Sequence, residues 1–165
     1  MKSLLGFRRA AVVAVAAASS LALVAPAAAA GAKFQSASAS VTNTGRLSVS
    51  FVEVGAGANQ TYGYTARASS AATYVCLNSS GKVASATNKI NVAGTVTQSG
   101  SYTADRNGKV VGTITVAPVP SNLGCPNGQT LALANVTYTN VSVTDVSNST
   151  TFPVSGTYSR TLIAI

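Results

Sequence analysis

The sequence predicts an all-β fold, an antiparallel β-sandwich of about eight or nine strands with one disulfide. Apolar residues alternate with Ser, Thr and other polar residues along most of the chain after residue 31, as in strands with one buried face. Short clusters of Gly, Asn, Pro and Ser separate these runs. No stretch in this part keeps helical spacing for as many as about three turns. Among sandwiches, an immunoglobulin-like Greek key fits the strand spacing best, although the chain has no Trp for the indole that antibody domains bury.

Each strand is identified by its alternation, and the segment 131–143 is the least regular. Its apolar residues move from odd to even positions and back. One extra residue at each change would produce these shifts, so bulges or a change of sheet are expected near Asn135 and Asn140.

The pair Asn107–Gly108 predicts a type I′ hairpin turn, which needs two residues that tolerate positive φ. The predicted strands cover residues 34–41, 47–52, 62–68, 74–78, 90–96, 110–116, 131–143 and 161–165.

Residues 1–30 have the layout of a secretory signal peptide. Lys2, Arg8 and Arg9 form a positive start, and an apolar run follows over residues 10–24. Small residues then offer A-x-A cleavage frames, which predicts cleavage within about 28–32 and leaves residues 31–165 as a single domain. The apolar run is shorter than the roughly twenty residues of a transmembrane helix, so a retained anchor is the less favoured interpretation. The expected location is extracellular, free or associated with the cell wall.

Cys76 and Cys125 are the only cysteines, and in an exported chain a single pair predicts a disulfide. A bridge that closes a loop of about fifty residues would stabilise the fold by about 4 kcal/mol. Cys125 lies among Pro and Gly residues, so the bridge is expected to hold a loop against the strand of Cys76. The alternative, two free thiols in a redox or metal site, has no C-x-x-C spacing and no His to support it.

The charged residues argue against most catalytic chemistry. The chain has no His, so it has no Ser–His or Cys–His pair and no His metal ligand. Its three acids, Glu53, Asp105 and Asp145, are expected to be solvated and well separated near turns or strand ends. We therefore predict no enzyme activity, no catalytic residues, no metal and no other cofactor. No nucleic-acid partner is expected either, because the cations after the leader are scattered rather than clustered. They are Lys33, Arg46, Arg67, Lys82, Lys89, Arg106, Lys109 and Arg160.

Two groups of residues are candidates for binding. The first is the loop over residues 118–129, which prolines and a disulfide would hold rigid, as in many secreted protease inhibitors. A stiff crossover between strands is the favoured alternative for this loop. The second group is Tyr62 and Tyr64, which share one strand face and could form an aromatic surface, although core packing is favoured. The loop residues named as a possible binding segment are Pro118, Pro120, Ser121, Asn122 and Leu123.

The Ala- and Val-rich leader, the stretch Tyr74-Val75-Cys76-Leu77-Asn78 and the stretch Cys125-Pro126-Asn127-Gly128-Gln129 resemble uncharacterised small secreted proteins of actinobacteria. The resemblance implies a secreted β-sandwich and carries no active residues. We therefore expect a non-catalytic extracellular or cell-surface module for binding or structure. Its partner would be an extracellular protein, a glycan or a cell-wall component. The alternatives are a secreted enzyme inhibitor that presents the 118–129 loop, and a carrier that holds an apolar small molecule between its sheets.

Overall fold

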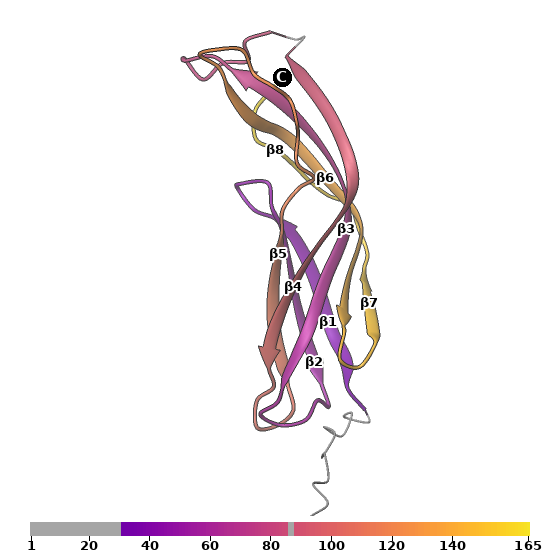
Figure 1. The fold of residues 1–165 in the computed structure, drawn as a ribbon. Coiled ribbons are helices and arrows are strands. Elements are labelled where there is room, and N and C mark those ends of the chain that lie inside the picture. Colours follow the sequence, from indigo (N-terminus) through magenta and orange to yellow (C-terminus); the bar gives the residue numbers. More distant parts are fainter. Residues whose placement is uncertain (1–30, 86–87) are drawn as a thin grey trace, which may run out of the picture.

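A computed structural model describes residues 31–85 and 88–165, so the predicted leader lies outside the described residues. The described chain is all-β, with two antiparallel sheets packed against each other (Figure 1). This arrangement confirms the predicted sandwich, and its eight strands agree with the expected eight or nine. One sheet has the order β1-β2-β5, and the other has the order β4-β3-β6-β7, with β8 also paired to β6. The strands are β1 (Lys33–Val41), β2 (Leu47–Val54), β3 (Thr61–Leu77), β4 (Lys89–Thr103), β5 (Val110–Val116), β6 (Thr130–Asp145), β7 (Thr150–Val154) and β8 (Tyr158–Thr161).

The second sheet is much longer than the first. β3, β4 and β6 have 17, 15 and 16 residues and run along the whole molecule, whereas β1, β2 and β5 cover only its lower half in Figure 1. We call the end that holds the turn after β4 the lower end, and the end where β3 finishes the upper end. β7 and β8 pair one after the other with the same edge of β6, at Val141–Asp145 and at Asn135–Tyr138.

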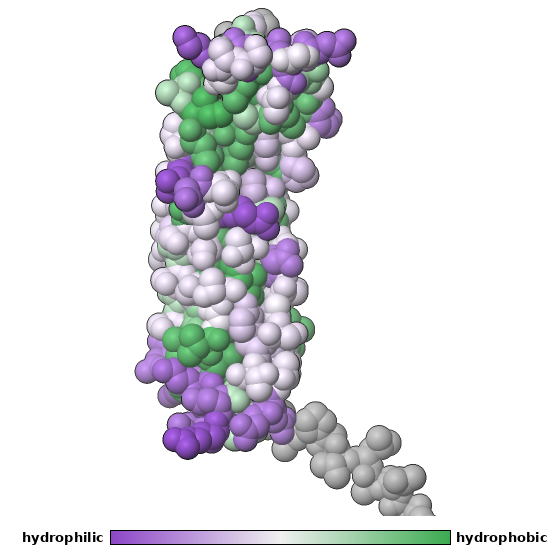
Figure 2. All heavy atoms as spheres, turned by 90° about the vertical axis from the view of Figure 1, so that its left-hand side faces the viewer, coloured by the Kyte–Doolittle hydropathy of each residue, from purple (hydrophilic) through white to green (hydrophobic). Residues whose placement is uncertain are grey.

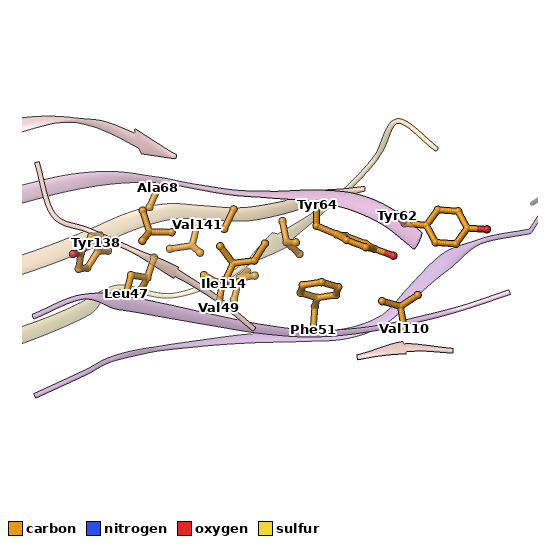
Figure 3. Close-up of a cluster of buried hydrophobic side chains, with 14 of the residues drawn as sticks. Leu47, Val49, Phe51, Tyr62, Tyr64, Ala68, Val110, Ile114, Tyr138 and Val141 are labelled. Carbon is orange, nitrogen blue, oxygen red and sulfur yellow. The ribbon is translucent and has the colours of Figure 1, made fainter. Parts of the chain in front are cut away.

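The sandwich core lies in the lower half, between the two sheets (Figure 3). Alternate residues of β2 and β3 point into it, among them the aromatic rings of Phe51 and Tyr64, whose centroids are 4.5 Å apart. Phe34 and Tyr102 pack edge-on against this pair. Full burial of such an apolar side chain stabilises a fold by about 1.5–3 kcal/mol, so this cluster is a main source of stability.

β6 carries the two irregularities that its sequence predicts. Arg67 pairs with Ser142 but Ser69 pairs with Thr139, so β6 has one more residue than β3 in this interval. Asn140 lies there with a φ of 51°, a left-handed conformation that Asn tolerates better than most residues. A second shift lies between Thr73 and Tyr74 of β3, opposite the region of Asn135. The predicted bulges near Asn135 and Asn140 are therefore confirmed.

The prediction for Asn107–Gly108 was wrong in two respects. The turn joins β4 of one sheet to β5 of the other, so it does not close a hairpin of paired strands. Only Gly108 has a positive φ, 73°, whereas a type I′ turn needs two such residues. The cause is Asp105, whose Oδ1 accepts hydrogen bonds from the N–H groups of Asn107 and Lys109 and fixes a turn with one left-handed residue.

The last strand also differs from its prediction. β8 is Tyr158–Thr161, so it ends where the predicted strand 161–165 begins. The N–H groups of Leu162 and Ile163 both donate to the carbonyl oxygen of Ala134, at 2.7 and 3.0 Å. Because both donors converge on one acceptor, the chain leaves the ladder of β6 at this point. It then continues along the upper end of the molecule.

Candidate functional site

The predicted disulfide between Cys76 and Cys125 is present, with Cα atoms 5.6 Å apart. Cys76 is fully buried near the end of β3, and Cys125 belongs to the 118–129 loop. The bridge therefore holds this loop against the upper part of β3, as the sequence predicted.

The 118–129 loop is anchored to β3 at a second place. The Val119 N–H donates to Ser70 Oγ at 3.3 Å, and the Tyr74 hydroxyl donates to the Val119 carbonyl oxygen at 2.9 Å. The loop also joins β5 of one sheet to β6 of the other. These contacts support the crossover interpretation. Within the predicted binding segment, Pro120 and Asn122 are exposed, whereas Pro118, Ser121 and Leu123 are half-buried.

Tyr62 and Tyr64 do not form an aromatic surface, and this alternative is corrected. They do share one face of β3, but that face points into the sandwich. Tyr62 is 7% exposed and its hydroxyl accepts a hydrogen bond from the Gly57 N–H at 2.7 Å, while Tyr64 is completely buried. Core packing, the favoured alternative, is what the structure has.

Two of the three acidic residues form a buried cluster with Tyr64, which the sequence analysis did not foresee. Glu53 and Asp145 are both fully buried, whereas Asp105 is exposed in its turn as expected. The Tyr64 hydroxyl donates to Glu53 Oε2 at 2.6 Å, and Asp145 is the strand partner of Tyr64. The expectation of separate, solvated carboxylates was therefore wrong for Glu53 and Asp145.

The Asp145 carboxylate closes the turn that follows it. Its Oδ1 accepts hydrogen bonds from the N–H groups of Ser147 and Asn148, at 2.8 and 3.2 Å. Its Oδ2 accepts a third hydrogen bond, from Asn148 Nδ2, at 2.6 Å. These contacts explain how a turn residue comes to be buried, since the turn folds over its own carboxylate.

The surroundings of Glu53 disfavour the ionised form of its carboxyl group. Burial raises the pKa of Glu53, the hydrogen bond from Tyr64 opposes the rise in part, and the neighbouring Asp145 adds to it. Glu53 Oε1 is the single buried side-chain oxygen or nitrogen of the described residues without a hydrogen-bond partner. Protonation of Oε1 would make this atom a hydrogen-bond donor, and Asp145 is a neighbouring acceptor. Burial also keeps any substrate away from both carboxyl groups.

A signal for this cluster is present in the sequence. Glu53 continues the inward-facing odd positions of Leu47, Val49 and Phe51, and Asp145 continues those of Val141 and Val143. The period of two that identifies the strands thus also predicts that both carboxyl groups point into the core. Their position near strand ends favours solvated side chains instead, and this is the signal that fails here.

A groove of about 480 Å³ lies at the upper end of the molecule, far from this cluster. Its size is within the range of small-molecule sites. Figure 2 shows apolar side chains gathered near this end, below a hydrophilic tip. Val75 lies on the face of β3 opposite to Tyr74 and Cys76, so the groove and the 118–129 loop lie on opposite faces of the sheet. The described lining consists of Val75, Gly81, Lys82, Val83, Ser85, Lys89, Ile163, Ala164 and Ile165.

Local hydrogen bonds fix the two walls of the groove. On one side, Asn78 Oδ1 accepts hydrogen bonds from the N–H groups of Ser80 and Lys82, at 3.1 and 3.0 Å. The Ala84 N–H then donates to the Cys76 carbonyl oxygen, which holds the segment that contains Val83 beside β3. On the other side, the bonds to Ala134 described above direct residues 162–165 along the groove. No pattern in the sequence indicates that these two segments meet.

The charges on the molecule are unevenly distributed around this groove. Lys82 and Lys89 contribute to its lining. Lys89 pairs with Val75, whereas Asp145 pairs with Tyr64, eleven residues earlier in β3. At ~3.3 Å per residue these positions are roughly 35 Å apart. Glu53 contacts Tyr64, and Asp105 follows the end of β4 at the lower end, so all three acidic side chains are remote from the groove.

Within residues 31–85 and 88–165, no helix is long and apolar enough to cross a membrane. The same residues contain no group of three or more His, Cys, Asp or Glu side chains that could hold a metal ion. Comparison with protein-family models, with curated proteins and with solved structures found no match for this chain.

Proposed function

We propose that this protein is an exported, non-catalytic binding module that holds a small ligand with an apolar part in the upper groove. The observation that carries the proposal is the apolar lining of the groove, which Val75, Val83 and residues 163–165 provide. Concave sites of this size with a few polar groups at the rim are typical of small-molecule binding. The site lies on one face of the long sheet rather than between the sheets, where a carrier was expected to hold its ligand.

The distribution of acidic groups supports a non-catalytic role. Two of the three carboxyl groups are inside the core, and the third, Asp105, uses its carboxylate to fix a turn. The chain has no His for general acid or base chemistry.

The strand order supports an immunoglobulin-like arrangement. Three connections, β2 to β3, β4 to β5 and β5 to β6, cross from one sheet to the other in the way that Greek-key sandwiches do. The disulfide is compatible with an extracellular location, as the predicted leader requires.

The test is the binding of a neutral apolar dye, N-phenyl-1-naphthylamine, followed by its fluorescence. Val83→Asp places a charge in the groove and is expected to weaken dye binding at least tenfold, because an unpaired carboxylate resists desolvation. The matched control is Val111→Asp, since Val111 is 63% exposed on β5. Leu123→Ala, in the 118–129 loop, is a second control.

Both controls are expected to bind the dye as the wild type does, and circular dichroism shows whether each variant is folded. Absence of dye binding by the wild type contradicts the proposal. So does equal binding by wild type and a folded Val83→Asp variant.

A further inference from the structure

We propose that the ligand of the upper groove is an amphipathic anion, a single apolar chain with one anionic headgroup. This inference rests on the proposed function and narrows it to a chemical class. Val75, Val83 and residues 163–165 would hold the chain, and Lys82 and Lys89 would hold the headgroup.

The walls of the groove provide apolar surface for a chain. Val75 is fully buried at its base, while Ile165 is 59% exposed and is one of the few large apolar side chains that the described fold leaves in water. A chain laid against Val83 and Ile165 would remove apolar surface of both partners from water, which is the main favourable contribution to binding of this kind. Polar ligands would gain nothing from these side chains.

The two lysines of the groove provide positive charge for a headgroup. Each ammonium group offers three hydrogen-bond donors, and its methylene stem can line an apolar surface while its charge stays in water. Lys82 and Lys89 have no acidic side chain to neutralise them, because the nearest lies roughly 35 Å away along β3, several times the ~8 Å screening length at physiological salt. The groove therefore combines an apolar floor with two lysines at its rim, and no acidic side chain of the described residues lies near them.

This combination selects against two other ligands. A neutral apolar molecule would fill the floor but leave both ammonium groups without a partner. An anion without a chain would meet only exposed lysines, which bind weakly at physiological salt. Only a molecule that has both parts uses every feature of the site.

The test compares decanoate, below its micelle concentration, with 1-decanol, which has the same chain and no charge. Isothermal titration of the purified protein is expected to give at least tenfold tighter binding of decanoate, the gain of about one charge-assisted hydrogen bond. The double variant Lys82→Ala/Lys89→Ala is expected to lower decanoate affinity to that of 1-decanol and to leave 1-decanol unchanged. The control Lys33→Ala/Lys109→Ala removes two exposed lysines near the lower end and should change neither affinity.

The outcomes separate this inference from the proposed function. Equal binding of decanoate and 1-decanol, insensitive to the lysine variants, overturns the amphipathic anion and leaves an apolar binding module. Binding of neither probe, together with no binding of the neutral dye, overturns both. Binding to vesicles that contain phosphatidylglycerol without binding to monomeric decanoate also overturns the inference, because the site would then recognise a membrane surface.

Discussion

Glu53→Gln is expected to remove the loss of stability that the raised pKa of Glu53 predicts for the wild-type protein as pH rises above about 4.5. In the unfolded chain Glu53 titrates near 4.5, and in the folded protein burial raises the pKa of this carboxyl group. Below the unfolded value both states hold the proton, so this group contributes its full stability there. Between the two values the unfolded chain releases the proton and the folded protein keeps it, so the free energy of unfolding falls by about 1.4 kcal/mol per pH unit. Above the pKa of Glu53 in the folded protein, the free energy of unfolding stops falling.

Gln keeps the contacts of the protonated acid without titrating. Its amide nitrogen can donate toward Asp145, and its oxygen can accept the hydrogen bond from Tyr64. The difference in unfolding free energy between variant and wild type should therefore grow with pH above 4.5, in favour of Gln. Urea unfolding at a series of pH values measures this difference. Glu53→Ala instead leaves the Tyr64 hydroxyl without an acceptor in the core and is expected to lose about 2–4 kcal/mol.

Asp105→Asn is the control for this experiment. Hydrogen bonds from the N–H groups of Lys109 and Asn107 lower the pKa of the exposed Asp105 carboxyl group, which is the opposite direction to Glu53. The stability that the Asp105 carboxylate contributes is present above its unfolded pKa and is lost as pH falls. Asp105→Asn should therefore change the free energy of unfolding only at acidic pH. An unchanged slope above pH 4.5 in the Glu53→Gln variant would show that Glu53 is ionised in the core.

The double variant Cys76→Ser/Cys125→Ser is expected to lose about 4 kcal/mol of unfolding free energy. The bridge spans 49 residues of sequence, so its removal restores much conformational freedom to the unfolded chain. It also releases the 118–129 loop from Cys76, so that the hydrogen bonds of Val119 to Ser70 and Tyr74 would hold the loop to β3. Ser is close to Cys in size, which limits the cavity left behind.

Chemical denaturation of oxidised wild type, reduced wild type and the double variant measures the effect of the bridge. Reduced wild type and the double variant are expected to agree, since both lack the bridge. A loss under about 1 kcal/mol in both would mean that the loop stays ordered without the disulfide, contrary to the chain-entropy argument.

Periodicity in the sequence was sufficient to predict the sandwich, the bulges of β6 and the side of most strands that faces the core. It was less useful for strand length. Residues 62–68 and 74–78 were expected as separate strands but form the single strand β3, because the small residues Ala68, Ser70 and Ala72 continue the buried face with little apolar signal. Alternation also carried the information that Glu53 is buried, although position near a strand end suggested otherwise.

The upper groove could not have been predicted in this way. Val75, Val83 and Ile163 belong to three segments, and only the pairing of β3 with β4 and of β6 with β8 brings these segments to one end of the molecule. Of the two lysines, Lys82 follows a turn and Lys89 begins a strand, positions where isolated cations are common. Their shared position in the groove is a property of the tertiary structure.

The most direct test of the binding role is a titration of the isotope-labelled protein with decanoate, followed by amide chemical shifts. Binding in the upper groove predicts that the largest changes occur at Val83, Lys89 and Ile163, with little change at the lower end of the sandwich. Largest changes at Asn122 and Leu123, in the loop on the opposite face of the sheet, would contradict a ligand site in the groove.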